Sequence, residues 1–481
     1  MSNRPETNKQ SCPVYKKCGG CQLQNLSYPE QLEFKQKKVE KLLKRFCTVE
    51  KIIGMKTPYH YRNKVQAAFY TDKKGKIISG VYQSGSHHVV GIDSCQTEDV
   101  IADKIIVAVR KLLPSFRMTT YNEDTGKGFL RHILVKRGFA TNQIMLVLVT
   151  GTPVFPSKNN FVKAILKQFP EITTIVQNIN PYRTNLVLGD NQKVLYGKGY
   201  IKDILCGCRF RISPKSFYQI NPVQTEVLYG KAIEFANLKG NETVLDTYCG
   251  IGTIGIIAAK NGAGNVIGAE LNGDAVRDAI VNARANNLKN IRFYKADAGE
   301  FMREAADEDE KPDVVFMDPP RAGSDRKFLD SLIKMSPKKV VYVSCNPETL
   351  ARDLAYLTQN SPYKAQKIQP VDMFPHTAHI ETVVKLVKKT PDTYIDITVD
   401  MDELDLTASE AKATYEEIKQ YILDKYDTKV SNLYIAQVKE KYGIIERENY
   451  NKPKSANTKQ SQCPAEKAEM IEEAFKHFKM I

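Results

Sequence analysis

Two side chains, Cys345 and Glu381, carry the most informative chemistry in this sequence of 481 residues. Cys345 follows an apolar run at 340–343 and precedes Pro347, a residue typical of the first position of a helix. We therefore expect its thiol at the end of a buried strand, facing a helix N-terminus whose dipole favours the thiolate. Glu381 follows two histidines in a short loop segment. A nucleophilic thiol with a separate carboxylate base is typical of covalent catalysis.

The elements that would position these groups alternate between strand and helix from about residue 206 to 390. This alternation predicts an α/β fold, a doubly wound, Rossmann-like parallel sheet with helices on both faces. Ligands bind such sheets at the carboxyl ends of the strands. The predicted strands lie near 243–246, 266–270, 291–294, 313–317 and 339–343.

Acidic residues follow several of these strands and suggest a nucleoside pocket. Gly250 and Gly252 allow a tight turn and a close approach of the backbone to a ligand. Glu270 ends the next strand, where a carboxylate can accept both ribose hydroxyls, and Asp297 follows the third strand, where it could meet an adenine edge. Asp318 precedes two prolines, which suits either a wall for a flat base or a helix cap. Bulky residues around the glycine turn favour a small nucleoside such as S-adenosylmethionine over a dinucleotide.

Four cysteines could form a metal site. Cys12, Cys18 and Cys21 lie close together near the start of the sequence, and Cys95 lies far downstream. Four thiolates can bind zinc or a 4Fe–4S cluster, and the spacing alone does not choose between them. The spacing differs from that of radical S-adenosylmethionine enzymes, and four protein ligands leave no iron open, so we expect a structural role. The remaining thiols, expected to be ordinary, are Cys47, Cys206, Cys208, Cys249 and Cys463.

The charge of the chain indicates a polyanionic partner. A net charge of +15 and a pI of about 9.1 make nucleic acid the first candidate. No apolar stretch is long enough for a bilayer and the first residues contain no secretion signal, so we expect a cytoplasmic protein, acting as a monomer. The basic side chains expected to contact an RNA backbone are Lys35, Lys37, Lys38, Arg62, Lys64 and Arg131.

Three regions differ in composition. Residues 1–205 mix short strands and turns and would form an α+β domain that holds the cysteine cluster and binds RNA, with a strand pair at 131–137 and 143–149. Residues 206–390 form the catalytic domain. Residues 391–481 begin with an acidic linker and continue with helices near 411–425, 431–442 and 466–478, which fit either a helix-turn-helix or an accessory bundle.

Five motifs occur in an order that resembles a known family, the RNA uracil-5-methyltransferases, and specifically their iron–sulfur branch acting on 23S ribosomal RNA. The resemblance covers about residues 12–388 and leaves out the tail. It implies a class I methyltransferase fold that binds S-adenosylmethionine through Gln219, Tyr248, Glu270, Asp297 and Asp318, and a 4Fe–4S cluster on Cys12, Cys18, Cys21 and Cys95. It also implies Cys345 as nucleophile and Glu381 as base. The motifs are Ser216–Asn221, Leu245–Gly252, Asp318–Gly323, Val343–Pro347 and Phe374–Glu381.

The expected reaction forms 5-methyluridine through a covalent intermediate. Cys345 would add to C6 of uracil, C5 would then take the methyl group of S-adenosylmethionine, and Glu381 would remove the C5 proton. His376 and His379 are expected to shape the loop before Glu381. Three alternatives stay open: the same chemistry on transfer RNA, a non-catalytic RNA-binding iron–sulfur redox sensor, and a cytosine-5 enzyme, although the last usually carries its cysteine in other motifs.

Overall fold

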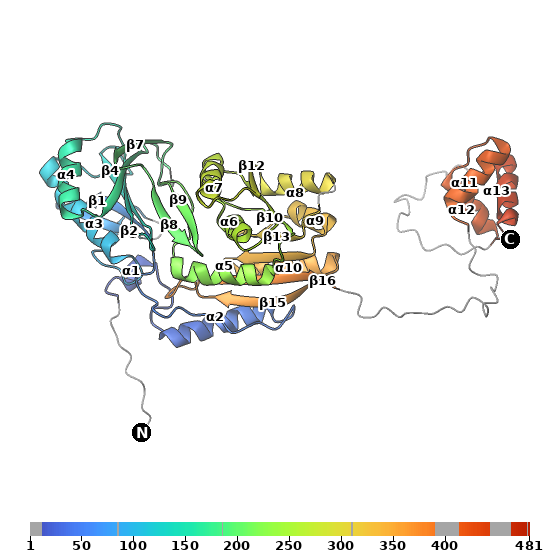
Figure 1. Ribbon diagram of the computed structural model, residues 1–481, viewed down its shortest axis with the longest axis horizontal. Coiled ribbons are helices and arrows are strands. Elements are labelled where there is room, and N and C mark those ends of the chain that lie inside the picture. The colour runs from blue at the N-terminus through green and yellow to red at the C-terminus, as the bar shows by residue number, and fades with distance from the viewer. Residues whose placement is uncertain are drawn as a thin grey trace, which may run out of the picture. The chain divides into compact units, whose positions relative to one another are not determined.

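The computed structural model describes residues 12–83, 86–184, 186–308, 311–389, 413–442, 463–478 and 480–481. The chain forms two compact units, Met1–Asp392 and Thr393–Ile481 (Figure 1). The linker predicted after residue 391 lies outside the described residues.

The first unit opens with an antiparallel-rich sheet of seven strands in the order β3-β2-β1-β4-β5-β6-β7. Helices α3 (Val100–Leu112) and α4 (Lys158–Gln168) bury their apolar residues against one face of it. The strand pair predicted at 131–137 and 143–149 is present as β4 and β5, which pair antiparallel. The strands are β1 (Lys64–Thr71), β2 (Ile77–Tyr82), β3 (Val89–Gly91), β4 (Leu130–Arg137), β5 (Ile144–Thr150), β6 (Ile172–Ile179) and β7 (Asn191–Tyr196).

The second sheet also has seven strands, in the order β12-β11-β10-β13-β14-β16-β15. Strands β10 to β14 pair in parallel, as the alternation of strands and helices predicts, but β16 pairs antiparallel with both β14 and β15. The expectation of an entirely parallel sheet is therefore wrong at this edge. The short connection between β15 and β16 explains the difference, because only a long crossover can return a strand in parallel. The strands are β10 (Thr243–Asp246), β11 (Asn265–Glu270), β12 (Ile291–Lys295), β13 (Val314–Met317), β14 (Lys339–Ser344), β15 (Tyr363–Val371) and β16 (Glu381–Lys388).

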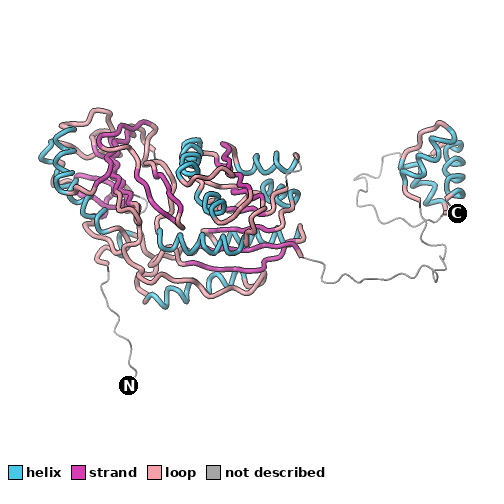
Figure 2. The backbone as a smooth tube through the Cα atoms, viewed as in Figure 1, coloured by secondary structure: helices cyan, strands magenta, loops and turns pink. Residues whose placement is uncertain are grey.

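Helices cover both faces of the second sheet, as predicted (Figure 2). Successive residues of a strand point to opposite faces, so Val314 packs into the core on one side and Val315 into the core on the other. Both faces of the second sheet are buried, which accounts for the continuous apolar runs of its strands in the sequence. One face carries α5 (Pro222–Ala236), α6 (Thr253–Lys260) and α7 (Gly273–Ala285), and the other carries α8 (Ala298–Asp307), α9 (Arg326–Met335) and α10 (Pro347–Asn360).

Two further elements join the two sheets into one unit. The hairpin β8 (Ile201–Leu205) and β9 (Cys208–Ile212) contributes to a core that also takes Leu134 and Val147 from the first sheet. The expected domain boundary at 205 falls in the turn of this hairpin. Helix α2 (Tyr28–Leu43), which follows the single turn α1 (Tyr15–Cys18), packs beside β15 and α10 (Figure 1).

The second unit contains α11 (Tyr415–Tyr426), α12 (Asn432–Lys441) and α13 (Ala465–His477). Their apolar faces meet in a small core of their own, centred on Ile422, Ile435 and Phe475. No helix in the described ranges is both long and apolar enough to cross a bilayer.

Candidate active site

Cys345 lies between a strand and a helix, where the sequence places it. Strand β14 ends at Ser344, and α10 begins at Pro347 with Asn346 as its cap, whose side chain accepts a hydrogen bond from the Glu348 amide. The cysteine is half-buried. Its position at the carboxyl end of a central strand is the position at which α/β sheets bind ligands.

Glu381 reaches the same place from the opposite direction. It opens β16, and the antiparallel register pairs Ser344 with the next residue, Thr382. One step further outward, Cys345 and Glu381 therefore face each other at the ends of neighbouring strands. Glu381 is 4% exposed.

The pKa values of these two groups depend on each other and on Asp318. Burial, followed by the carboxylates of Glu381 and Asp318, raises the pKa of Cys345 to about 11, with Arg321 opposing them. Burial, and then Asp318, raise the pKa of Glu381 well above its ordinary value. The expected thiolate-favouring effect of the helix N-terminus is therefore outweighed, because the helix contributes only a partial charge whereas burial removes water from the whole thiol.

Arg321 is the functional candidate that sequence reasoning missed. Its carbonyl oxygen accepts hydrogen bonds from Asn346 Nδ2 and Thr349 Oγ1, both at 3.2 Å, so the beginning of α10 fixes its backbone beside Cys345. Its charge lowers the pKa of both Cys345 and Glu381. Its position directly after Asp318-Pro-Pro, at the end of a predicted strand, is the sequence feature that could have identified it as a site residue.

Hydrogen bonds of His376 hold the loop that precedes Glu381. His376 has a positive φ of 69°. Its ring nitrogens lie 3.2 Å from Gln31 Nε2 and 2.9 Å from the Pro58 carbonyl oxygen. His379 lies 3.5 Å from Arg321 Nη2. Both contacts of His376 are structural, in agreement with the expected role in shaping the loop.

The glycine turn after β10 forms a backbone cradle. Gly250 and Gly252 both have positive φ values, of 55° and 83°. Glu270 accepts a hydrogen bond from the Gly250 amide at 3.1 Å and another from the Asn272 amide at 2.7 Å. A side chain at Gly252 would lie 2.8 Å from the Phe293 ring, so only glycine fits there.

Two carboxylates, the buried Asp246 and the half-buried Asp318, lie beside this cradle. Asp246, which was not among the predicted site residues, accepts a hydrogen bond from the Gly255 amide through Oδ2, and its buried Oδ1 has no partner. Burial raises the pKa of Asp246 and that of Asp318 to about 7. An unpartnered buried carboxylate oxygen at a glycine turn fits a ligand that brings hydrogen-bond donors or positive charge.

The other predicted cofactor residues occupy three different settings. Gln219 lies three residues ahead of α5, and its carbonyl oxygen accepts from Asn63 Nδ2 at 3.2 Å. The Tyr248 ring packs against Phe328 with centroids 5.5 Å apart. Asp297 caps α8 by accepting from the Gly299 and Glu300 amides and is exposed.

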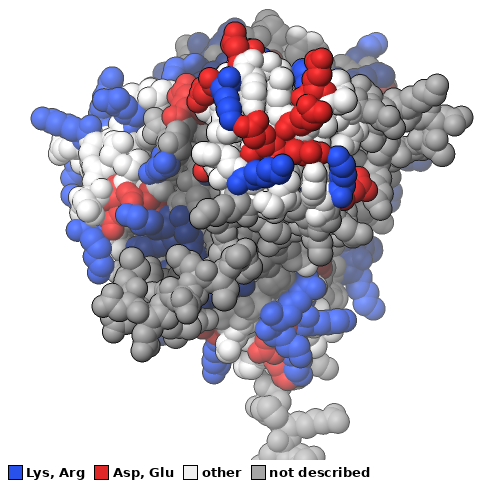
Figure 3. Space-filling model, turned by 90° about the vertical axis from the view of Figure 1, so that its right-hand side faces the viewer, with Lys and Arg blue, Asp and Glu red and all other residues white. Residues whose placement is uncertain are grey.

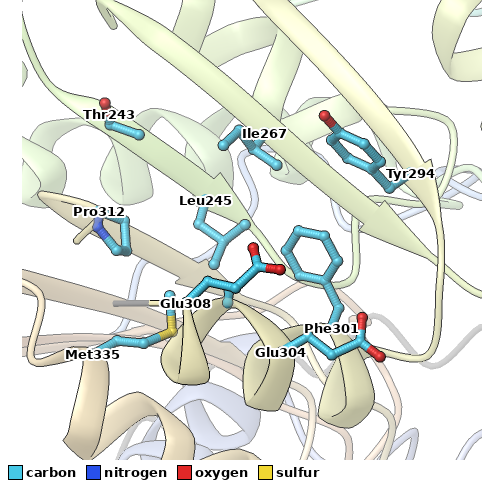
Figure 4. A pocket seen from close by; sticks show the side chains of 10 residues that line it. Thr243, Leu245, Ile267, Tyr294, Phe301, Glu304, Glu308, Pro312 and Met335 are labelled. Carbon is cyan, nitrogen blue, oxygen red and sulfur yellow. The ribbon is translucent and has the colours of Figure 1, made fainter. Parts of the chain in front are cut away.

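A separate hollow of about 230 Å³ lies between the second sheet and α8 (Figure 4). Leu245, Ile267 and Tyr294 line it from the strands, and Phe301 and Glu304 line it from the helix. None of the predicted cofactor residues belongs to its lining, so this hollow is distinct from the glycine cradle.

The four predicted metal ligands line one small cavity, of about 20 Å³. Burial, followed by the charges of Cys95, Cys18 and Cys12, raises the pKa of Cys21 to about 12, with Arg62 opposing. Within the described residues, no three His, Cys, Asp or Glu side chains are arranged so that they could hold a metal ion. The metal-binding role of these cysteines therefore stays a prediction.

Several basic residues expected to contact RNA are engaged elsewhere. Lys35 is fully buried and pairs with Asp372 at 2.5 Å, and Arg131 is buried against Glu123 at 2.6 Å. Lys37 and Lys38 form ion pairs nearer the surface. Figure 3 shows one side of the molecule, on which Lys and Arg side chains and Asp and Glu side chains lie next to one another in several places.

Known proteins are similar to this chain in sequence. The model of the family tRNA (uracil-5-)-methyltransferase matches residues 182–389. An uncharacterised RNA methyltransferase of Bacillus cereus is 44% identical over 385 residues, which cover 79% of this chain and 83% of the relative. An uncharacterised RNA methyltransferase of Listeria monocytogenes is 46% identical over 379 residues, which cover 78% and 83%.

A solved structure shows the same fold. The tRNA (uracil-54, C5)-methyltransferase of Pyrococcus abyssi, in complex with S-adenosyl-L-homocysteine, is 31% identical, with a TM-score of 0.65 over 79% of this chain and 88% of that one. The second sheet and its helices thus have the class I architecture of S-adenosylmethionine-dependent methyltransferases.

Proposed function

Because this chain belongs to the uracil-5 family of RNA methyltransferases, we propose that it methylates C5 of a specific uridine in 23S ribosomal RNA. The observation that carries the proposal is the meeting of Cys345 and Glu381 at the ends of β14 and β16. The ribosomal target rests on the five motifs, which resemble those of the iron–sulfur branch.

The residues around the glycine cradle fit S-adenosylmethionine. Glu270 would accept the ribose hydroxyls, and Tyr248, Gln219 and Asp297 would complete the nucleoside site. The unpartnered Oδ1 of Asp246 and the half-buried carboxyl of Asp318 offer negative charge. Bound there, S-adenosylmethionine supplies a methyl group on a positively charged sulfur.

Cys345 makes the uracil ring reactive. Its thiol first loses a proton to solvent, and the sulfur then bonds to C6 of the base. The electrons of the C5–C6 double bond move into the C4 carbonyl as an enolate, which makes C5 a nucleophile. The positive charge of Arg321 favours the thiolate, since it lowers the pKa of Cys345.

Glu381 completes the reaction as a base. After C5 has gained the methyl group, Glu381 removes the C5 proton. The electrons of that C–H bond restore the double bond and expel the sulfur of Cys345. The target base must leave its stack to reach these residues, at a cost of a few kcal/mol.

The four cysteines would bind a 4Fe–4S cluster. All four donors are thiols around one cavity, which fits the ligand set of such a cluster. The role of the cluster is to tie the segment around Cys21 to the loop at Cys95.

Trapping and mapping test the proposal together. The purified protein is incubated with labelled S-adenosylmethionine and with transcripts of 23S ribosomal RNA or transfer RNA, and methylated uridines are mapped. 5-Fluorouridine in the RNA should trap a covalent complex with the wild type and none with Cys345→Ala. Methylation confined to transfer RNA would show that transfer RNA, and not 23S ribosomal RNA, is the substrate. The description of the matching family and the Pyrococcus enzyme support this alternative. No methylation of any RNA would remove the function.

A further inference from the structure

Two adjoining hollows lie on the first sheet, far along the chain from Cys345. Their volumes are about 520 and 290 Å³. They share Tyr82, His87 and Glu123, so one set of side chains forms part of the wall of both.

Aromatic rings line these hollows. The ring centroid of Tyr82 lies 5.9 Å from that of His132 and 6.1 Å from that of His87. The ring centroids of Tyr70 and His88 are 6.5 Å apart. Aromatic side chains on a sheet are a common platform for unstacked RNA bases.

Two buried polar atoms in the linings have no partner. They are Nδ1 of His132 and the hydroxyl of Tyr121, and the two side chains are only 5% and 3% exposed. Buried polar groups are normally hydrogen-bonded, so two unpartnered ones at adjoining hollows point to a bound group that supplies the missing partners. Burial lowers the pKa of His132 to about 4, so its imidazole is neutral at physiological pH.

In the larger hollow the charges of Arg131 and Glu123 cancel, which favours a neutral ligand there, whereas Asp124 adds a carboxylate to the lining of the smaller hollow. Arg131 donates from Nε and Nη2 to the two carboxylate oxygens of Glu123, at 2.6 and 2.7 Å. Its remaining hydrogen bonds go to the carbonyl oxygens of Asn180, Tyr182 and Thr184. The Arg131 guanidinium therefore has no free N–H edge with which to bind a phosphate. A neutral heterocycle does not require such a charged partner.

The hollows share a strand face with the cofactor side of the molecule. His132 and Lys136 are four residues apart on β4, so they lie on the same face, about 13 Å apart. Lys136 donates to the carbonyl oxygens of Ser213 and Ser216, just before Gln219. Between them Leu134 is 4% exposed and packs into the core with β8 and β9, so protein covers this face between the hollows and the catalytic domain.

We propose that these hollows bind unpaired nucleobases of the RNA substrate, with Tyr82 stacking on a base and His132 and Tyr121 bonding to base edges. The inference rests on the proposed function only in taking RNA as the substrate. It adds a second recognition site, away from the base that is methylated.

Binding of short RNAs tests this site without catalysis. The full-length protein is titrated with fluorescent octamers of adenylate, of uridylate and of an abasic ribose-phosphate chain, at one fixed salt concentration. Tyr82→Ala should weaken binding of the base-bearing octamers about tenfold or more. Tyr82→Phe should bind as the wild type does, and the matched control Tyr196→Ala, an exposed tyrosine of the same sheet, should change nothing.

Tyr121→Phe separates ligand binding from folding. It removes a hydroxyl that has no protein partner, so Tm should not fall, while octamer affinity should drop about three- to tenfold. Either of two results would overturn the site. In the first, Tyr82→Ala binds the base-bearing octamers as tightly as the wild type does. In the second, the wild type binds the base-bearing octamers no more tightly than the abasic octamer. Trapping at Cys345 is measured in parallel, so a missing covalent complex with intact base-dependent binding would count against the proposed function alone.

Discussion

Cys345 and Glu381 extend the antiparallel pair Ser344–Thr382 by one residue, so the proposed nucleophile and the proposed base face each other from strands of opposite direction. Burial and then the Glu381 carboxylate raise the pKa of the thiol to about 11. The resting site therefore disfavours two negative charges at once, and each step of the proposed reaction needs only one of the two groups as an anion.

Replacing the base should stall the reaction after methyl transfer. In Glu381→Gln, Cys345 can still add to C6, but nothing removes the C5 proton. We expect turnover to fall about 100- to 10,000-fold, with methylated RNA retained on the protein. Denaturing gels and mass spectrometry would detect the complex, and Cys345→Ala, which should bind S-adenosylmethionine normally, is the control without a complex. Normal turnover of Glu381→Gln would assign the base elsewhere.

The free thiol should react slowly at neutral pH. Alkylation by iodoacetamide requires the thiolate, and a pKa of about 11 leaves Cys345 protonated at pH 7. The rate at the Cys345 peptide should therefore rise with pH across the neutral and mildly alkaline range without a plateau. Glu381→Gln should shift this profile to lower pH, because it removes a neighbouring negative charge. A plateau near neutral pH in the wild type would contradict the pKa assignment.

S-adenosylmethionine should bind more tightly as pH rises through 7. Burial raises the pKa of Asp318 and of Asp246 to about 7, so below this pH both are largely protonated, and above it they can attract a cation. Calorimetry across this range should give a falling Kd that levels off at higher pH. Asp318→Asn should bind more weakly at high pH and show a flatter profile; an unchanged profile would exclude Asp318 from this role.

Removing the buried lysine should destabilise the protein. Lys35 and Asp372 are both fully buried and 2.5 Å apart, so Lys35→Met leaves a buried carboxylate without its counter-charge. We expect a loss of about 3–5 kcal/mol in the free energy of unfolding. Lys37→Met, which breaks an exposed, solvent-screened ion pair on the same helix, should cost far less stability. Equal losses in chemical denaturation would contradict the difference in burial.

The cysteine cavity should hold iron and sulfide. Protein purified without oxygen should contain about four irons and four sulfides per chain. Cys21→Ser should lose most of both and keep S-adenosylmethionine binding, while Cys463→Ser, in the C-terminal unit, should keep the full content. Zinc in place of iron and sulfide would favour the alternative left open by the cysteine spacing.

The sequence predicted what depends on local pattern. Apolar runs and glycine turns located the strands of the second sheet, and Pro347 located the start of α10. Effects that depend on distant partners were missed: the antiparallel β16, the burial of Lys35 against Asp372, and the raised pKa of Cys345. Each arises from residues that are separated in the chain and brought together only by packing, and a basic residue looks the same in sequence whether it is solvated or buried.

The loop that leads into Glu381 is bound by the beginning of the chain. The Leu23 amide donates to the His376 carbonyl oxygen, Tyr61 Oη donates to the Pro375 carbonyl oxygen, and Gln31 contacts the His376 ring. During synthesis on the ribosome, more than three hundred further residues must be added after these early residues before the loop that they bind is made. Glu381, the proposed base, is thus not positioned until β16 is made, and under the proposed mechanism an unfinished copy would be inert.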